Sequence, residues 1–239
     1  MSWHVIYLAD VAPTPWKNGG GTTRELVAWP DAEHWVWRMS RWIAVLGGAG
    51  LALTHNGQRH ALTVDSAPFC FDGGAPTGCE LINGVTQDFN LMARLAGDVG
   101  EAGEAGVAGV AGDVGEAGGP CQAGDAWASA RVSRVQGNAS WLLNTIKTIA
   151  IYAIHTGARV CFNGENMPIS PGSLAWRTVA AQDVIQIDAE DALLIEIDVQ
   201  PAGVVHSLKD MVTGAATHIS THLSNHAPTP VPVHSGSMP

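Results

Sequence analysis

The sequence has few charged residues, and positive charge is the scarcer kind. Charged side chains make up 14% of the 239 residues, and 12 Lys and Arg stand against 22 Asp and Glu, for a net charge of −10. Nucleic-acid binding needs a concentrated positive field, so this balance excludes a general nucleic-acid-binding role. Because no apolar run reaches the roughly 18 residues of a membrane-spanning helix, we expect no membrane partner either.

The residues that build redox and catalytic sites occur without the spacings that such sites use. The cysteines form no CxxC pair, which favours free thiols in a reducing cytoplasm over a disulfide framework; they are Cys70, Cys79, Cys121 and Cys161. The N-terminal MSWHVIYLAD lacks the basic and small-residue segments of a signal peptide, which also favours the cytoplasm. No Ser-His-Asp or Cys-His set can be assigned from spacing, so no catalytic residue is predicted.

Three histidines recur at every fourth position near the C-terminus, namely His218, His222 and His226. On a helix they would share one face, which is an arrangement that can bind a metal ion. They lie beside a Pro-rich tail and lack a carboxylate partner. We therefore expect neither a metal nor another cofactor.

What the sequence does contain is a repeated alternation of apolar and polar residues, which is the period of a β-strand. Leu51–Val64 forms two short apolar runs around Asn56-Gly57, the dipeptide best suited to a two-residue hairpin turn. Val184–Val199 has the same form around Ala189–Asp191, which predicts another hairpin. No β-α-β alternation occurs, so the predicted fold class is all-β, as a barrel or a sandwich.

One segment departs from this pattern. From Gly97 to Gly118 glycine stands at every third position, with five acidic residues and no basic one. The segment contains no proline, which disfavours a collagen triple helix and favours a disordered acidic linker. The predicted organisation is an N-terminal β half at 1–94, the linker at 95–125, a C-terminal β half at 126–210 and a His/Pro-rich tail at 211–239.

The stretch PWKNGGGTTREL, Pro15 to Leu26, has the composition of an anion-binding loop. A nucleotide-binding P-loop places its lysine after the glycines and before a helix. Here Lys17 precedes the glycines and a strand-like run follows them, so a P-loop is excluded. The glycines then form either a plain turn or one that lets another backbone approach closely. In the strand after them, Thr23 and Glu25 lie on one face.

The stretch CELINGVTQDFNLMAR places Asp88 and Asn90 on one strand face, with Phe89 and Leu91 on the other. On the inner face of a barrel the polar pair would form a ligand-binding wall. On an outer face the pair would be solvated, and composition alone favours this second alternative.

Together, three stretches resemble the HutD/Ves family in order and spacing: PWKNGGGTTRELVAWP, then WRMS, then PFCFDGGAPTGCELINGVTQDFNLM. The resemblance covers most of residues 3–94, whereas the C-terminal half is similar only in its β character and in the turn PISPGSL. It implies a bicupin, with two RmlC-like cupin β-barrels separated by a disordered Gly-rich insertion. It also implies a cytoplasmic bacterial protein that binds a small carboxylate, such as urocanate or a formylated glutamate, and moderates histidine utilisation.

The resemblance further implies a ligand site at the mouth of the first barrel, to which the glycine turn would bring its neighbours. The candidates for this site are Lys17, Asn18, Thr23, Glu25, Arg41, Asp88 and Asn90. Arg41 is the candidate for the main contact with the anion, because a guanidinium can make two charge-assisted hydrogen bonds to one carboxylate. Many cupins hold a metal with a His-x-His pair, and the sequence has no such pair, so no metal is expected.

The chain departs from the family's pattern in one important place. The family carries a Phe-Ser-x-Phe-x-Gly-x-Asp-Arg segment after WRMS, whereas here Ser40 is followed directly by Arg41. Two alternatives to a binding protein stay open: a metal-independent cupin enzyme acting on a related metabolite and, because of this gap, a degenerate relative that binds nothing. A small carboxylate is the expected partner, and a homodimer is a further alternative.

Overall fold

The structure is a computed structural model that describes residues 2–17, 20–29, 39–94, 130–198 and 217–224. Within these ranges every regular element is a β-strand except one 3-10 turn, η1 (Leu8–Asp10). The predicted all-β class is therefore confirmed. The Gly-rich segment at 95–125 and the end of the tail lie outside the described residues, so the predictions about them stay predictions.

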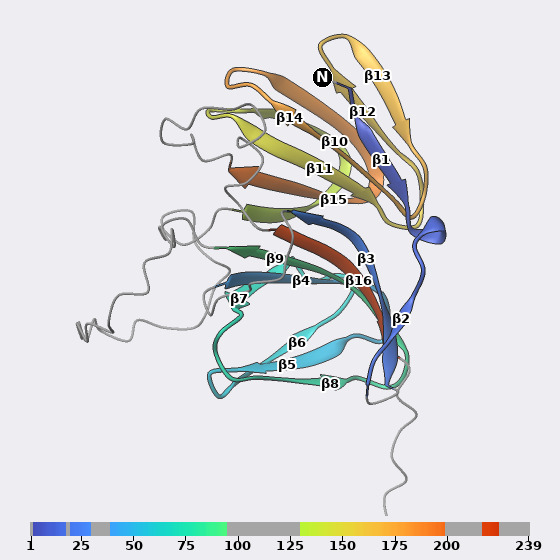
Figure 1. The fold of residues 1–239 in the computed structure, drawn as a ribbon, viewed down its shortest axis with the longest axis vertical. Coiled ribbons are helices and arrows are strands. Elements are labelled where there is room, and N and C mark those ends of the chain that lie inside the picture. The colour runs from blue at the N-terminus through green and yellow to red at the C-terminus, as the bar shows by residue number, and fades with distance from the viewer. Residues whose placement is uncertain (1, 18–19, 30–38, 95–129, 199–216, 225–239) are drawn as a thin grey trace, which may run out of the picture.

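Two sheets form one end of the molecule, the lower end in Figure 1. The larger has six strands, in the spatial order β2 (Thr14–Pro15), β3 (Gly21–Trp29), β16 (Thr217–Ser224), β9 (Thr86–Arg94), β4 (Met39–Gly48) and β7 (Phe69–Asp72). The smaller has three strands, in the order β6 (Gln58–Leu62), β5 (Leu51–His55) and β8 (Thr77–Leu81). Side chains of β4, such as Ile43 and Val45, pack with Leu51 and Leu53 of β5, so the two sheets share an apolar core.

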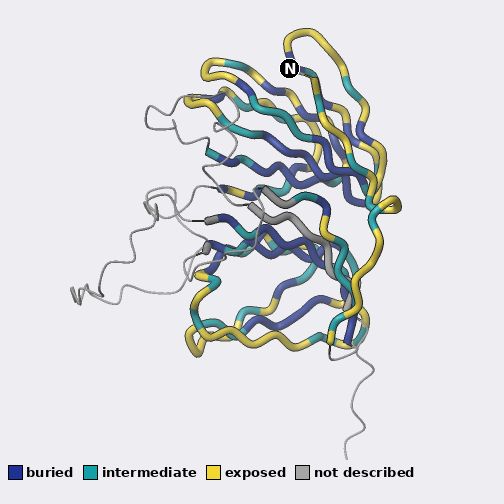
Figure 2. The backbone as a smooth tube through the Cα atoms, viewed as in Figure 1, coloured by how far each residue is buried: buried dark blue, intermediate teal, exposed yellow. Residues whose placement is uncertain are grey.

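A seven-stranded sheet covers the other face of the six-stranded sheet (Figure 1). Its order is β1 (His4–Tyr7), β14 (Ser173–Val179), β11 (Lys147–Ala153), β15 (Val184–Asp198), β12 (Ala158–Phe162) and β13 (Glu165–Ile169), and β10 (Ala130–Leu142) also pairs with β15. Because side chains alternate along a strand, Trp42 and Phe89 point away from the three-stranded sheet and pack with Tyr152 and Leu193 of the seven-stranded sheet. Figure 2 shows the buried residues concentrated where the sheets face one another.

The same strand-pairing scheme occurs twice along the chain. In the six-stranded sheet β4 pairs with β7 and β9, and in the seven-stranded sheet β11 pairs with β14 and β15. In each set the first strand, β4 or β11, is followed by a hairpin that turns on Asn-Gly, with φ of 49° and 78° at Asn56-Gly57 and of 51° and 80° at Asn163-Gly164. These angles suit a turn with two left-handed residues, and they confirm the predicted turn at Asn56-Gly57.

The hairpin predicted around Ala189–Asp191 is wrong. β15 is one strand of 15 residues that runs through this position. β10 pairs with β15 along nearly its whole length, whereas on the other edge the partner changes from β12 at Ala189 to β11 at Ala192. The polar residues that resemble a turn therefore mark a change of neighbour, and the segment contains no Gly or Asn that would favour a reversal.

Strands near both ends of the described chain join the sheet formed by the other part. β1 lies at the edge of the seven-stranded sheet beside β14, and β16 lies inside the six-stranded sheet between β3 and β9. The helix considered for the C-terminal histidines does not occur at His218 and His222, which are residues of strand β16, and His226 lies outside the described residues.

The cysteines differ in state. Cys79 and Cys161 are free thiols, as expected. Cys70 of β7 is disulfide-bonded, so the prediction of free thiols is wrong at this position. Cys121 lies outside the described residues.

Candidate functional site

A cavity of about 180 Å³ lies between the six-stranded and the three-stranded sheets. Its walls come from strands far apart in the sequence, because the two sheets bring β4, β9, β5, β7 and β8 together. The residues that line it are Trp16, Arg41, Ile43, Leu51, Leu53, Phe71, Thr77, Cys79, Asp88 and Asn90. One wall is therefore apolar, whereas the wall formed by β4 and β9 carries hydrogen-bonding and charged groups.

The polar wall is a chain of three side chains. Arg41 Nη2 donates a hydrogen bond to Asn90 Oδ1 at 3.2 Å, and Asn90 Nδ2 donates to Asp88 Oδ2. The guanidinium also lies over the ring of Phe71, with its central carbon 5.4 Å from the ring centroid. Arg41 Nε is buried and has no hydrogen-bond partner among the described residues. A buried N–H without a partner is costly, which makes this group a candidate contact for a ligand.

Burial is the largest influence on the pKa values of the titratable side chains in and beside this wall. Asp88 is 4% exposed, and burial raises the pKa of its carboxyl to about 7, although the hydrogen bond from Asn90 and the charge of Arg41 act in the opposite direction. Burial also lowers the pKa of Arg41, while the negative charge of Asp88 acts to raise it. Cys79 is exposed as a residue, yet burial of its side chain and the charge of Asp88 raise the pKa of its thiol.

Three of the predicted site residues come together in the cavity, namely Arg41, Asp88 and Asn90. The solvated alternative for the polar pair is wrong, since Asp88 and Asn90 are 4% and 1% exposed. Their strand β9 is covered on both faces, so alternation does not place one of its faces in water. Composition alone could not reveal the three-stranded sheet that covers this face.

The glycine turn contributes to the site through Trp16. The backbone N–H of Trp16 donates to Gly21 O at 2.9 Å, and its indole Nε1 donates to Thr23 Oγ1 at 2.7 Å. Thr23 therefore holds the ring that lines the cavity. Lys17 and Glu25 are exposed and are not among the described residues that line it.

Asn18, the remaining candidate, lies outside the described residues. Sequence reasoning missed Trp16, Phe71, Thr77 and Cys79, all of which line the cavity. Trp16 had a signal in the sequence, because it lies inside PWKNGGG, one of the stretches that resemble the HutD/Ves family, beside the predicted residue Lys17.

Neither a cluster of metal-binding side chains nor a membrane-spanning helix is found among the described residues. Within the described ranges, no three His, Cys, Asp or Glu side chains lie together as a metal site would require. The part of the chain that the structure describes also contains no helix long and apolar enough to cross a membrane. The prediction that the protein uses no metal stays a prediction.

Part of the chain is similar to a known family. Residues 8–99 match the family model described as HutD. The chain is 31% identical over 102 residues to an uncharacterized 21.2 kDa protein in the hutC 3' region of Pseudomonas putida, covering 35% of this chain and 54% of that protein. It is 34% identical over 107 residues to protein Ves of Cronobacter sakazakii, covering 36% of this chain and 59% of that protein. The chain thus spans little more than half the length of these two relatives.

Among solved structures, HutD from Pseudomonas fluorescens is similar with a TM-score of 0.55 and 22% identity, over 82% of this chain and 98% of that one. This likeness concerns the fold. The matched residues 8–99 include every residue that lines the cavity. Residues 8–99 of this chain are therefore similar to the HutD family.

Proposed function

We propose that this chain is a bicupin that binds a small carboxylate and moderates histidine utilisation in a bacterial cytoplasm. The family match and a relative in the hutC 3' region support the link to this pathway. The strand-pairing scheme that occurs twice, each time with an Asn-Gly hairpin, supports two cupin barrels, one in each part of the chain. We further propose that only the first barrel binds ligand, because the corresponding core of the second is filled by apolar side chains.

The observation that carries the binding proposal is the guanidinium of Arg41 in the cavity. An acidic protein must attract an anion with a local positive group, and Arg41 is the one cation among the described lining residues. Its buried Nε has no partner there, so a carboxylate oxygen can accept from it. Charge-assisted hydrogen bonds of this kind are about twice as strong as neutral ones.

The composition of the cavity favours a monocarboxylate with a flat apolar body. One cation balances one carboxylate, and Asp88 in its neutral form adds a hydrogen-bond donor without repelling the anion. Phe71 and Trp16 offer ring faces to the rest of the ligand. Urocanate has this chemistry, whereas a formylated glutamate carries a second carboxylate for which the described lining residues offer no second cation.

Calorimetric titration of urocanate and formylglutamate into the protein tests the proposal. Arg41→Ala should weaken binding of urocanate on the order of tenfold to a hundredfold, because a charged hydrogen bond to the ligand is lost. Arg59→Ala is the matched control, since Arg59 forms an exposed ion pair with Glu80 outside the cavity. Equal affinities of wild type and Arg41→Ala would remove Arg41 from the site. Absence of binding by wild type would favour the degenerate alternative.

A second candidate function follows from Asp88. A carboxyl group with a pKa of about 7 inside a ligand cavity has the property of a general acid or base, which supports a metal-independent cupin enzyme as the alternative. Incubating the protein with urocanate and following the ligand by NMR separates the two functions. Turnover that Asp88→Asn abolishes would support the enzyme, and an unchanged ligand spectrum would support the binding protein.

A further inference from the structure

Strand β4 has a bulge where it passes the cavity. Val45 pairs with Asp88 of β9, but the next paired residue of β4 is Gly47, opposite Gln87, so Leu46 is an extra residue on β4. On the other edge of β4, β7 pairs only with the segment from Ser40 to Ile43. The backbone of the bulge therefore needs hydrogen-bond partners from outside its own sheet.

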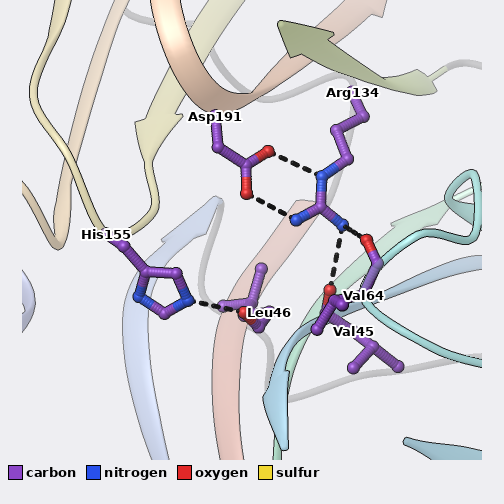
Figure 3. Close-up of polar contacts among 6 residues, drawn as sticks. All are labelled: Val45, Leu46, Val64, Arg134, His155 and Asp191. Carbon is purple, nitrogen blue, oxygen red and sulfur yellow. Dashed lines mark hydrogen bonds and ion pairs between the residues drawn. The ribbon is translucent and has the colours of Figure 1, made fainter.

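The seven-stranded sheet supplies these partners (Figure 3). Arg134 Nη1, from β10, donates to Val45 O at 3.1 Å. His155, which follows β11, contacts Leu46 O through Nε2 at 2.7 Å, and because a carbonyl only accepts, Nε2 carries the proton. Both carbonyls of the bulge are thus held by side chains of the opposite sheet.

Arg134 is itself firmly placed. Its Nε and Nη2 donate to the two carboxylate oxygens of Asp191, each at 2.6 Å, and Nη1 also donates to Val64 O (Figure 3). The side chains of Arg134 and Asp191 are only 12% and 19% exposed. A bidentate pair of this kind fixes the direction of the guanidinium, which leaves Nη1 aimed at the six-stranded sheet.

The bulge connects this contact to the cavity. Asp88 lies opposite Val45, and the carboxyl of Asp88 is part of the polar wall. A movement of the Val45 backbone therefore also moves Asp88, which is its partner on β9. Elsewhere the seven-stranded sheet meets β4 and β9 mainly through apolar packing, so the contacts to these two carbonyls are the polar link to the bulge.

We propose that Arg134 and His155 are positioning residues for the cavity: they hold the β4 bulge from the seven-stranded sheet, set the place of Asp88, and couple ligand binding to the contact between the sheets. The ligand part rests on the proposed carboxylate binding. The positioning part does not, because the place of Asp88 can be observed in the protein without ligand.

The test follows the Asp88 carboxyl by carbon NMR during a pH titration of the ligand-free protein. Replacing His155 by Phe removes the donor to Leu46, whereas His155→Gln keeps an N–H that can donate. We expect His155→Phe and Arg134→Gln to move the midpoint of the Asp88 titration by about half a unit or more, and His155→Gln to restore it toward wild type. The other titratable neighbours of Asp88 are the same in every variant; they are Arg41, Cys79 and His222, which pairs with Asp88 from β16.

Lys147→Gln is the matched control for loss of positive charge, since Lys147 pairs with Asp198 and Glu196 inside the seven-stranded sheet. It should leave the midpoint unchanged. In parallel, Arg134→Gln and His155→Phe should weaken urocanate binding about threefold to tenfold. An unchanged Asp88 midpoint in folded His155→Phe would overturn the proposal, and this variant decides alone if Arg134→Gln does not fold. Absence of urocanate binding by wild type would contradict the proposed carboxylate binding. The titration midpoint of Asp88 would still test whether Arg134 and His155 position this residue.

Discussion

Asp88 is a carboxylic acid enclosed by protein, and its charge changes near neutral pH. Its environment is the same buried wall that holds Arg41 and Asn90, so the group can be neutral below about pH 7 and ionised above it. In the unfolded chain the carboxyl has the ordinary pKa of an aspartate. The protein therefore binds more protons folded than unfolded in the interval between the two values, roughly pH 4 to 7.

This difference predicts a stability that falls as pH rises through that interval, since stability decreases wherever the folded state binds more protons. Between pH 4 and pH 8 the Asp88 contribution should change by on the order of 1–4 kcal/mol. Asp88→Asn should remove this part of the slope, because the amide does not titrate. Urea unfolding at several pH values measures it, with exposed Asp65→Asn as the control. Identical pH slopes in wild type and Asp88→Asn would contradict the prediction.

At the scale of an element, the turn between β4 and β5 requires glycine at position 48, because any side chain there would clash with the backbone. Gly48 has φ of 88°, and a Cβ added there would lie 2.1 Å from the carbonyl oxygen of Val85. Gly57, in the β5–β6 hairpin, has φ of 78° but open space around it. The two positions share the left-handed backbone and differ in steric room.

Gly48→Ala should therefore lower the free energy of unfolding by about 2 kcal/mol or more, whereas Gly57→Ala should cost about 1 kcal/mol. The larger effect comes from the clash with the Val85 backbone, which forces β4 and β9 apart. Urea unfolding of the two variants against wild type gives both values. Equal losses would mean that the backbone angle, and not the contact, sets the cost.

The elements also show what could be predicted from the sequence. Asn56-Gly57 was predictable because its conformation depends on two residues alone. The absence of a hairpin at Ala189–Asp191 was not predictable, because the polar residues there reflect a change of neighbouring strand along β15. Arg41 was predictable from the family resemblance and the chemistry of its guanidinium, whereas the burial of Asp88 depends on a three-stranded sheet that packs on β9 from elsewhere in the chain.

At the scale of the whole molecule, the Gly-rich segment is expected to be dispensable. Residues 97–119 carry five acidic residues, no basic residue and no large aromatic side chain to bury. Deleting them should leave the melting temperature unchanged, and limited proteolysis of the intact protein should cut there first. A drop of more than several degrees on deletion would show that the segment packs on the sheets.

The exchange of β1 and β16 between the sheets has a consequence for synthesis on the ribosome. β16 lies between β3 and β9, so the six-stranded sheet is incomplete until residues 217–224 emerge. The seven-stranded sheet in turn takes its edge strand β1 from residues 4–7, which are made before the rest of that sheet. Domains usually fold one after another as the chain grows, beginning at the N-terminus. Here β3 and β9 stay unpaired on their facing edges until residues 217–224 have been made, and the nascent chain depends on β16 to join them.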